Sequence, residues 1–454
     1  MYEWWDGQSW VPLPRRKPAP RAYLTAPTAP QRPVVIVSSD THIGPPLPDM
    51  RQYCPVRHLD EFDAFVSEHE DRRTSLRNTV LRAPGTPAGD HYQNNQATAG
   101  HNDPHARLRD LDWDGVAAQV LFHGSQNGEP TPFRHFAMGT AGAATTASSL
   151  ELASVGDHIY NQWLADFCSH QPERHVAATY IPYWNVEAAV DELRWARNAG
   201  LRGVNFPAQR IDMPQFNDPY WEPIWSTTEE LGMPLLTHIG GGHPLPITGS
   251  ERSSLLQIEG IMFGRRGIHW MIFSGVFERY PGLRIVPTEM PGEFWTSYVR
   301  ELDTAWLSHY EENREKCPRP PSEYCTENVF IGASFLSRAE ASAAVNDGYA
   351  AQVLWGSDYP HHEGTYQYPP DGNYAAESMT RRALRATFAG LPEREVRAMA
   401  GLNAVSVYGL DADRLAAVAE RISAPTFEEL SVPLDEARPA RAGKLAFRRL
   451  GPWA

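Results

Sequence analysis

Several apolar segments of the sequence end in an acidic residue or a histidine. The first ends in Asp40-Thr41-His42, and residues two apart lie on one face of an extended strand, so Asp40 and His42 would point the same way. Buried carboxylates without a partner are costly, and a divalent cation can compensate them. We therefore predict a metal site whose ligands are Asp40, His42, His238, Glu289, Asp358 and His361.

Each of these residues also has an ordinary structural explanation when it is taken alone. Asp40 could cap a turn, and Asp358 could form an Asx turn before Pro360. A single histidine at a strand end, such as His238, is more often hydrogen-bonded than metal-bound. The occurrence of all six residues at strand ends is what favours a metal site.

The elements that must position these residues are short strands alternating with helical patterns. The predicted strands cover 34–42, 117–124, 175–184, 201–208, 233–240, 283–291, 328–334 and 352–361. Near-continuous apolar strands between helices predict a parallel sheet that is buried on both faces. Eight such units match a (β/α)8 TIM barrel, an α/β fold whose active-site residues lie at the carboxyl ends of the strands. A doubly wound open sheet is the alternative, but no glycine-rich phosphate turn follows the first strand.

The barrel is predicted to span 34–410, with an arm at 1–33 and a C-terminal extension at 411–454. The arm contains seven prolines and three tryptophans, which predicts an extended segment that docks on its own barrel or on a partner subunit. Long insertions at 43–106 and 125–156 follow the first two strands and are typical of lids or oligomer contacts. We therefore expect a homo-oligomer, most simply a dimer.

Composition excludes several functional classes. The 454 residues carry a formal net charge of −14, which disfavours nucleic acid as a partner. There is no apolar run of membrane-spanning length and no secretory signal at the start of the sequence. The 4 cysteines are widely spaced, as in proteins of a reducing compartment. The expectation is a cytoplasmic enzyme that acts on a small molecule.

Longer motifs around the candidate ligands resemble the amidohydrolase-related family, the branch that includes aminocarboxymuconate-semialdehyde decarboxylase. Besides Asp-x-His they are THIGGG (237–242), LRIVPTEMPGEFW (283–295) and LWGSDYPHHEGTY (354–366). The likeness extends over about 34–410 and implies a metal-dependent TIM-barrel enzyme. Because this family contains hydrolases, decarboxylases and a few oxygenases, the resemblance alone does not select a reaction.

The sequence departs from the hydrolytic pattern of this family at two strands. The first strand has Asp-x-His where typical amidohydrolases have His-x-His, and the sixth has Glu289 where they have histidine. Three carboxylates and three imidazoles favour iron or manganese over zinc. Six ligands exceed what one catalytic ion usually takes, so two ions are expected. In this respect the chain resembles the dinuclear iron or manganese/iron hydroxylases of the same barrel.

The leading prediction is therefore O2-dependent hydroxylation of an aliphatic C–H bond by a dinuclear non-haem Fe or Fe/Mn centre. Aromatic residues end the third and fourth strands (Tyr180, Tyr183, Trp184 and Phe206) and predict a bulky apolar acid or an acyl thioester as substrate. The alternative is a hydrolase of C–N or C–O bonds, or a non-oxidative decarboxylase, that uses the same site with Zn or Mn.

Three further sets of residues are candidates for the site. His123, which closes the second strand, and His362 are predicted catalytic residues that line the pocket or carry a proton. The glycines at 240–242 would let a loop approach the metal closely. One residue of the first insertion could supply an extra ligand; the candidates there are His58, Asp60 and Glu61.

Overall fold

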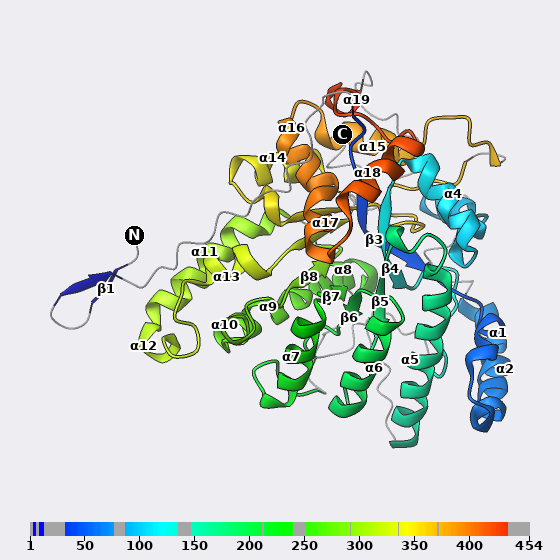
Figure 1. Cartoon of the computed structure of the whole chain (residues 1–454), viewed down its shortest axis with the longest axis horizontal. Coiled ribbons are helices and arrows are strands. Elements are labelled where there is room, and N and C mark those ends of the chain that lie inside the picture. Colours follow the sequence, from blue (N-terminus) through cyan, green and yellow to red (C-terminus); the bar gives the residue numbers. More distant parts are fainter. Residues whose placement is uncertain are drawn as a thin grey trace.

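A computed structural model describes residues 3–5, 9–12, 32–76, 87–134, 147–210, 213–238, 251–290, 292–334, 336–369 and 372–434. Figure 1 shows the barrel strands near the centre of the molecule, with helices packed around them.

Eight parallel strands form the barrel wall, each hydrogen-bonded to the next in chain order. They are β3 (Val37–Ile43), β4 (Ala118–His123), β5 (His175–Tyr180), β6 (Gly203–Asn205), β7 (Leu235–His238), β8 (Ile285–Thr288), β9 (Ile331–Ser334) and β10 (Val353–Gly356). The first and last strands meet through a bridge between Thr41 and Tyr359. The predicted (β/α)8 TIM barrel is confirmed.

Helices follow most of the strands and cover the outside of the barrel. The larger ones are α5 (Ala147–Cys168), α6 (Val186–Asn198), α7 (Glu222–Leu231), α8 (Arg252–Gly264), α9 (Arg266–Phe273), α11 (Trp295–Ser308), α13 (Pro321–Asn328), α14 (Arg338–Asn346) and α15 (Met379–Phe388). Local sequence fixes their ends: the Asn185 side chain accepts a hydrogen bond from Ala188 N at the start of α6. Alternate strand residues fill the barrel, among them Val120, Ala178 and Leu236.

Four strands end at least three residues earlier than predicted. The expected segments 175–184, 201–208, 283–291 and 352–361 shorten to β5, β6, β8 and β10. At two of these ends the backbone turns sharply, because Glu289 and Asp358 have φ angles of 58° and 55°. A positive φ is uncommon for residues other than glycine and is concentrated at functional sites. Both acidic side chains therefore lie on turns just beyond their strands.

The insertion after β3 contains α1 (Leu47–Met50), α2 (Leu59–Leu76), α3 (Pro87–Asn95), η4 (Ala99–His101) and α4 (Pro104–Asp114). Its Asn95 holds the loop after β10, since its side chain donates to Pro360 O at 2.8 Å and accepts from Tyr368 N at 2.9 Å. This insertion therefore packs over the carboxyl end of the last strand.

Described segments also precede and follow the barrel in the sequence. In the arm, β1 (Glu3–Trp5) pairs antiparallel with β2 (Trp10–Pro12); its docking on a barrel or a partner stays a prediction. After the barrel, α16 (Glu393–Arg397), a π-helical turn at Ala398–Leu402, α17 (Asn403–Tyr408), α18 (Ala412–Arg421) and α19 (Phe427–Ser431) follow. Val34 N donates to Pro425 O at 2.8 Å, so the described part of the extension packs against the start of the barrel.

No helix among the described residues has the length and apolar character needed to cross a membrane.

Candidate metal centre

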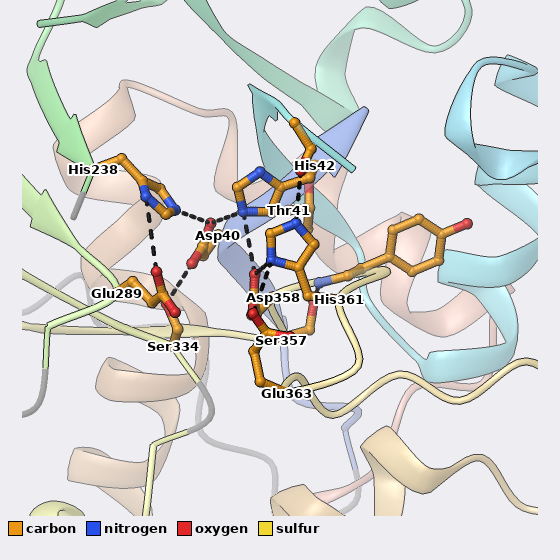
Figure 2. Close-up of polar contacts among 12 residues, drawn as sticks. Asp40, Thr41, His42, His238, Glu289, Ser334, Ser357, Asp358, His361 and Glu363 are labelled. Carbon is orange, nitrogen blue, oxygen red and sulfur yellow. Dashed lines mark hydrogen bonds and ion pairs between the residues drawn. The ribbon is translucent and has the colours of Figure 1, made fainter. Parts of the chain in front are cut away.

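The carboxyl ends of β3 and β7 and the turns after β8 and β10 meet at one mouth of the barrel. Figure 2 shows the side chains from these elements pointing toward one another. Among the described residues, three groups have ligand atoms within 4.8 Å of one another: Asp40, His42 and His238; His42, Asp358 and His361; and Glu289, Asp358 and Glu363. All six predicted ligands are therefore brought together, and Glu363 joins them.

Asp40 and His42 form the centre of this arrangement. His42 Nε2 lies 3.2 Å from Asp40 Oδ1 and 3.2 Å from Asp358 Oδ1. His238 Nε2 lies 3.6 Å from the same Asp40 oxygen, and His238 Nδ1 lies 3.8 Å from Glu289 Oε2. Two carboxylates and two imidazoles thus face a common space, as Figure 2 shows.

The donor atoms of this space suit a cation. Asp40 and Asp358 are fully buried. Asp40 Oδ1, His42 Nε2 and both Asp358 side-chain oxygens form no hydrogen bond within the described part of the chain, although Asp358 Oδ1 lies 2.9 Å from His361 Nδ1 as an ion pair. Buried polar atoms of this kind are costly unless something pairs with them. Oxygen and imidazole donors together are the ligands of Mn²⁺, Fe²⁺ and Zn²⁺, so the residues present fit a divalent transition metal.

Neighbouring groups fix how the two central ligands are presented. The Ser334 hydroxyl of β9 donates to Asp40 Oδ2 at 2.5 Å, which leaves Oδ1 facing the site. His42 Nδ1 lies 3.2 Å from His123 O. Because a carbonyl oxygen only accepts, His42 Nδ1 donates this hydrogen bond, and the ring directs Nε2 at the two carboxylates. Such outer partners set the tautomer of metal-binding histidines.

Electrostatics differ sharply between the acidic residues. Burial alone would raise the pKa of Asp40, but the neighbouring His238 and His42 hold it well below its usual range. Burial and the nearby Asp358 carboxylate raise the pKa of Glu289 far above that of an ordinary glutamate. Two adjacent carboxyl groups in a low-dielectric site cannot both ionise freely, and a cation relieves that repulsion.

Glu363 was missed by the sequence prediction, although it stands next to His362 in the motif at 354–366. Its two oxygens accept from Gln126 Nε2 at 2.9 Å, and Oε2 lies 2.7 Å from His362 Nδ1. Burial raises the pKa of Glu363, but the charge and hydrogen bond of His362 lower it below the usual range. His362 is therefore tied to Glu363 and lies outside the three metal-ligand groups.

Two residues of β4 border the centre. The Phe122 ring lies 5.9 Å from the His42 ring and 5.2 Å from the His238 ring, centroid to centroid. Strand alternation places Phe122 inside the barrel, so the sequence pattern could have identified it. The His123 ring instead packs 5.3 Å from Tyr160, and burial lowers its pKa to about 3. The role of His123 as a proton carrier stays a prediction.

The candidates from the first insertion lie elsewhere. His58 Nδ1 is 4.0 Å from Glu61 Oε1, and the side chains of Asp60 and Glu61 are exposed. None of the three belongs to the metal-ligand groups found among the described residues. The glycines at 240–242 lie outside the described residues.

Two curated relatives match more than half of the chain. A 2-amino-3-carboxymuconate-6-semialdehyde decarboxylase of Dictyostelium discoideum is 27% identical over 270 residues, 57% of this chain and 67% of its own length. A gamma-resorcylate decarboxylase of Rhizobium sp. is 26% identical over 269 residues, 56% of this chain and 76% of its own length.

Solved structures share the fold at lower identity. The 5-carboxyvanillate decarboxylase of Sphingomonas paucimobilis superposes with a TM-score of 0.54 at 18% identity and covers 83% of this chain and all of its own. The same type of enzyme from Novosphingobium aromaticivorans, solved with manganese and 4-hydroxy-3-methoxy-5-nitrobenzoic acid, gives a TM-score of 0.57 at 17% identity, covering 84% of this chain and 98% of its own.

The prediction of an O2-dependent monooxygenase is wrong. Every relative named above is a decarboxylase, and none of them is named as an oxygenase. The ligand set that suggested a dinuclear iron centre, three carboxylates and three imidazoles, does not by itself select oxygen chemistry. Carboxylate-rich sites also suit Mn²⁺.

The amidohydrolase sequence profile matches residues 103–410, about two thirds of the chain. This match begins at α4 and ends just after α17, so it includes every strand from β4 to β10. It confirms the family resemblance carried by the motifs around His238, Glu289 and Asp358. The chain therefore belongs to the amidohydrolase family.

Proposed function

We propose that this protein is a metal-dependent, non-oxidative decarboxylase of a small aromatic or otherwise unsaturated carboxylic acid. The observation that carries the proposal is the convergence of Asp40, His42, His238 and Asp358 on one buried space at the barrel mouth. The names of the relatives support decarboxylation over the other reactions of this fold.

The reaction breaks the bond between the carboxylate carbon and the ring carbon. Its electron pair stays on the ring carbon, which takes up one proton, and CO2 leaves. No oxidant or reductant is consumed. The site must therefore bind an anionic acid, stabilise negative charge on the substrate and deliver a proton to carbon.

A divalent ion, Mn²⁺ or Zn²⁺, would be held by Asp40, His42, His238 and Asp358 and would withdraw electron density from oxygen atoms of the bound acid. Ser334 and the His123 carbonyl orient the first two of these ligands. The Phe122 ring packs beside both imidazoles, tilted to His42 and edge-on to His238. One ion replaces the two expected from the sequence, because these four residues face a single space.

Glu289 is assigned as the residue that delivers the proton. Its carboxyl group lies on the rim of the four-ligand set, 3.8 Å from His238 Nδ1, and its side chain is partly accessible from the barrel mouth. Glu363, the other rim carboxyl, is already occupied by Gln126 and His362. Position therefore favours Glu289.

The substrate should be a flat acid. Aromatic side chains at the strand ends surround the mouth, and Tyr183 and Trp184 pack edge to face with centroids 5.0 Å apart. The Arg134 guanidinium lies 4.9 Å from the Trp184 ring and 5.5 Å from the Tyr180 ring, and its Nη2 donates to Asp157 Oδ2 at 2.6 Å, so an ion pair borders these rings. One structural relative was solved with 2,6-dihydroxybenzoate, an acid of this class.

The test is CO2 release by metal-free protein reloaded with Mn²⁺ or Zn²⁺, using hydroxylated benzoic acids with and without O2. We expect metal-dependent CO2 release at the same rate under both atmospheres. His42→Ala should abolish it, whereas His309→Ala on the exposed end of α11 should not. Cleavage of amides or esters with no CO2 from any acid would replace this proposal with hydrolysis.

We also propose that the enzyme is a homo-oligomer of the cytoplasm. The four cysteines are buried and form no disulfide, which supports a reducing compartment. The proline- and tryptophan-rich arm supports association. Light scattering of the full chain should give a multiple of the 50.9 kDa monomer mass, and a monomer would contradict this part of the proposal.

A further inference from the structure

The proposed metal ligands lie on both sides of the place where the barrel closes. Asp40 and His42 belong to β3, the first strand of the barrel, and Asp358 follows β10, the last. Three backbone contacts join these edges: the Thr41–Tyr359 bridge, a hydrogen bond from His42 N to Tyr359 O at 2.6 Å, and one from Asp358 N to Asp40 O at 2.9 Å. The spacing of the ligands thus depends on how firmly this seam is held.

Helix α4 covers the seam, and two of its buried charged residues, Arg107 and Asp110, contact it. Arg107 Nη1 donates to His42 O at 2.8 Å, and its Nη2 donates to Thr41 Oγ1 at 3.0 Å. Its guanidinium carbon also lies 3.9 Å from the centre of the Tyr359 ring. Arg107 therefore contacts both edges of the seam.

Asp110 binds the other edge through Tyr359. Its Oδ2 accepts from the Tyr359 hydroxyl at 2.7 Å, from Thr98 Oγ1 at 2.5 Å and from the Tyr366 hydroxyl at 3.0 Å, while Oδ1 accepts from the Tyr374 hydroxyl at 2.6 Å. Hydrogen bonds to a buried carboxylate are stronger than those between neutral groups. The Tyr359 hydroxyl packs directly against Gly100 of η4. A side chain at position 100 would clash with this hydroxyl, so the close contact requires glycine there.

We propose that Asp110 and Arg107 are positioning residues that set the metal affinity of the site by clamping the β3–β10 seam. Asp110 acts on Asp358 through the adjacent Tyr359, and Arg107 acts on His42 through its carbonyl oxygen. Neither residue touches the ligand atoms. This inference rests on the proposed function, since it assumes that Asp40, His42 and Asp358 bind the ion.

A metal site tolerates displacements of its ligands poorly, and loss of the outer hydrogen bonds that orient them typically costs about 10- to 100-fold in affinity. Asp358 adopts a left-handed backbone conformation, which persists only when its surroundings hold it. The hydrogen bond from the Tyr359 hydroxyl to Asp110 links the residue after Asp358 to α4.

The experiment measures Mn²⁺ affinity of the full chain by electron paramagnetic resonance of free Mn²⁺ during titration. Tyr359→Phe keeps the ring over Arg107 and deletes only the hydroxyl. We expect its affinity to fall about 10-fold, with a changed spectrum of the bound ion. Tyr374→Phe is the matched control, because it removes a hydrogen bond of similar length to the same carboxylate on the side away from the seam; its affinity should stay within about twofold.

Urea unfolding of the metal-free variants separates positioning from loss of stability. Tyr359→Phe should bind Mn²⁺ more weakly than Tyr374→Phe even where the two have equal unfolding free energies. Asp110→Asn should also weaken Mn²⁺ binding. If Asp110→Asn does not fold, the Mn²⁺ affinity of Tyr359→Phe alone tests the inference. Equal Mn²⁺ affinity of Tyr359→Phe and the natural protein would overturn this inference alone. A natural protein that binds no Mn²⁺ would overturn the proposed metal site and this inference with it.

Discussion

The imidazole of His361 stacks on that of His42, with ring centroids 3.9 Å apart and planes inclined by 14°. His361 Nε2 lies 2.8 Å from Gly124 O, and its Nδ1 lies 2.9 Å from Asp358 Oδ1. The ring is thus fixed at both nitrogens while its face fixes the plane of His42. His361 was predicted as a ligand, and these contacts favour a role in orienting His42 and Asp358.

Replacement of His361 by phenylalanine tests that role. His361→Phe keeps a flat ring against His42 but removes both nitrogen contacts. We expect Mn²⁺ affinity to fall about 10-fold, since one outer partner of Asp358 is lost. Isothermal titration measures the change, with His309→Phe on the exposed end of α11 as the control. Unchanged affinity of His361→Phe would show that neither nitrogen contributes to the site.

Two substitutions distinguish a ligand from a proton donor at the rim. His238→Ala should lose both bound metal and activity, because His238 faces Asp40 directly. Glu289→Gln keeps the shape of the side chain but cannot deliver a proton, so kcat should fall about 100-fold or more while the metal stays bound. Metal analysis and steady-state kinetics on the same preparations check both outcomes. Loss of metal from Glu289→Gln would instead make Glu289 a ligand, as the sequence predicted.

The sequence predicted which candidate ligands lie together where strand geometry alone determines their positions. Asp40 and His42 are two apart on one strand, and His238 is the last residue of β7, so alternation and strand order brought them together. Phe122 follows the same alternation. These positions depend on local pattern and on the barrel, and both can be read from apolar periodicity.

The other residues of the site are positioned by backbone conformations and long-range contacts that leave no local pattern in the sequence. Glu289 and Asp358 turn into the site through positive φ angles, which the sequence does not reveal for acidic residues. Ser334 reaches Asp40 across 294 residues of chain, and Asp110 reaches Tyr359 across 249. The reaction itself was predicted wrongly, because the same carboxylates and imidazoles serve oxygenation, hydrolysis and decarboxylation.

Metal removal should lower stability as well as activity. Binding of an ion to the folded state alone stabilises it by about 2.7 kcal/mol at a concentration 100 times the dissociation constant. Addition of Mn²⁺ to chelator-treated protein should therefore raise Tm in a concentration-dependent way. In His42→Ala, which lacks the residue shared by two of the ligand groups, that rise should disappear. A Tm that ignores Mn²⁺ in the natural protein would argue against a metal at Asp40 and Asp358.

Acid should destabilise the metal-free protein through buried histidines, of which His175 at the start of β5 is the clearest. Its Nε2 lies 3.0 Å from His170 O, which can only accept, and its Nδ1 lies 3.0 Å from Gln119 Nε2, which can only donate. The ring is therefore held neutral, and burial, with a smaller contribution from Arg174, lowers its pKa to about 3.

Since the unfolded chain binds a proton at His175 near the ordinary pKa of about 6.5, the unfolded state binds more protons than the folded state between pH 6.5 and 3. The free energy of unfolding must then fall as the pH drops through that window. Urea unfolding in chelator at pH 7.5 and 5.5 measures the fall. In His175→Gln it should be smaller by about 1 kcal/mol, whereas His309→Gln at an exposed position should match the natural protein. An identical fall in His175→Gln would mean that the ring is not kept neutral by the fold.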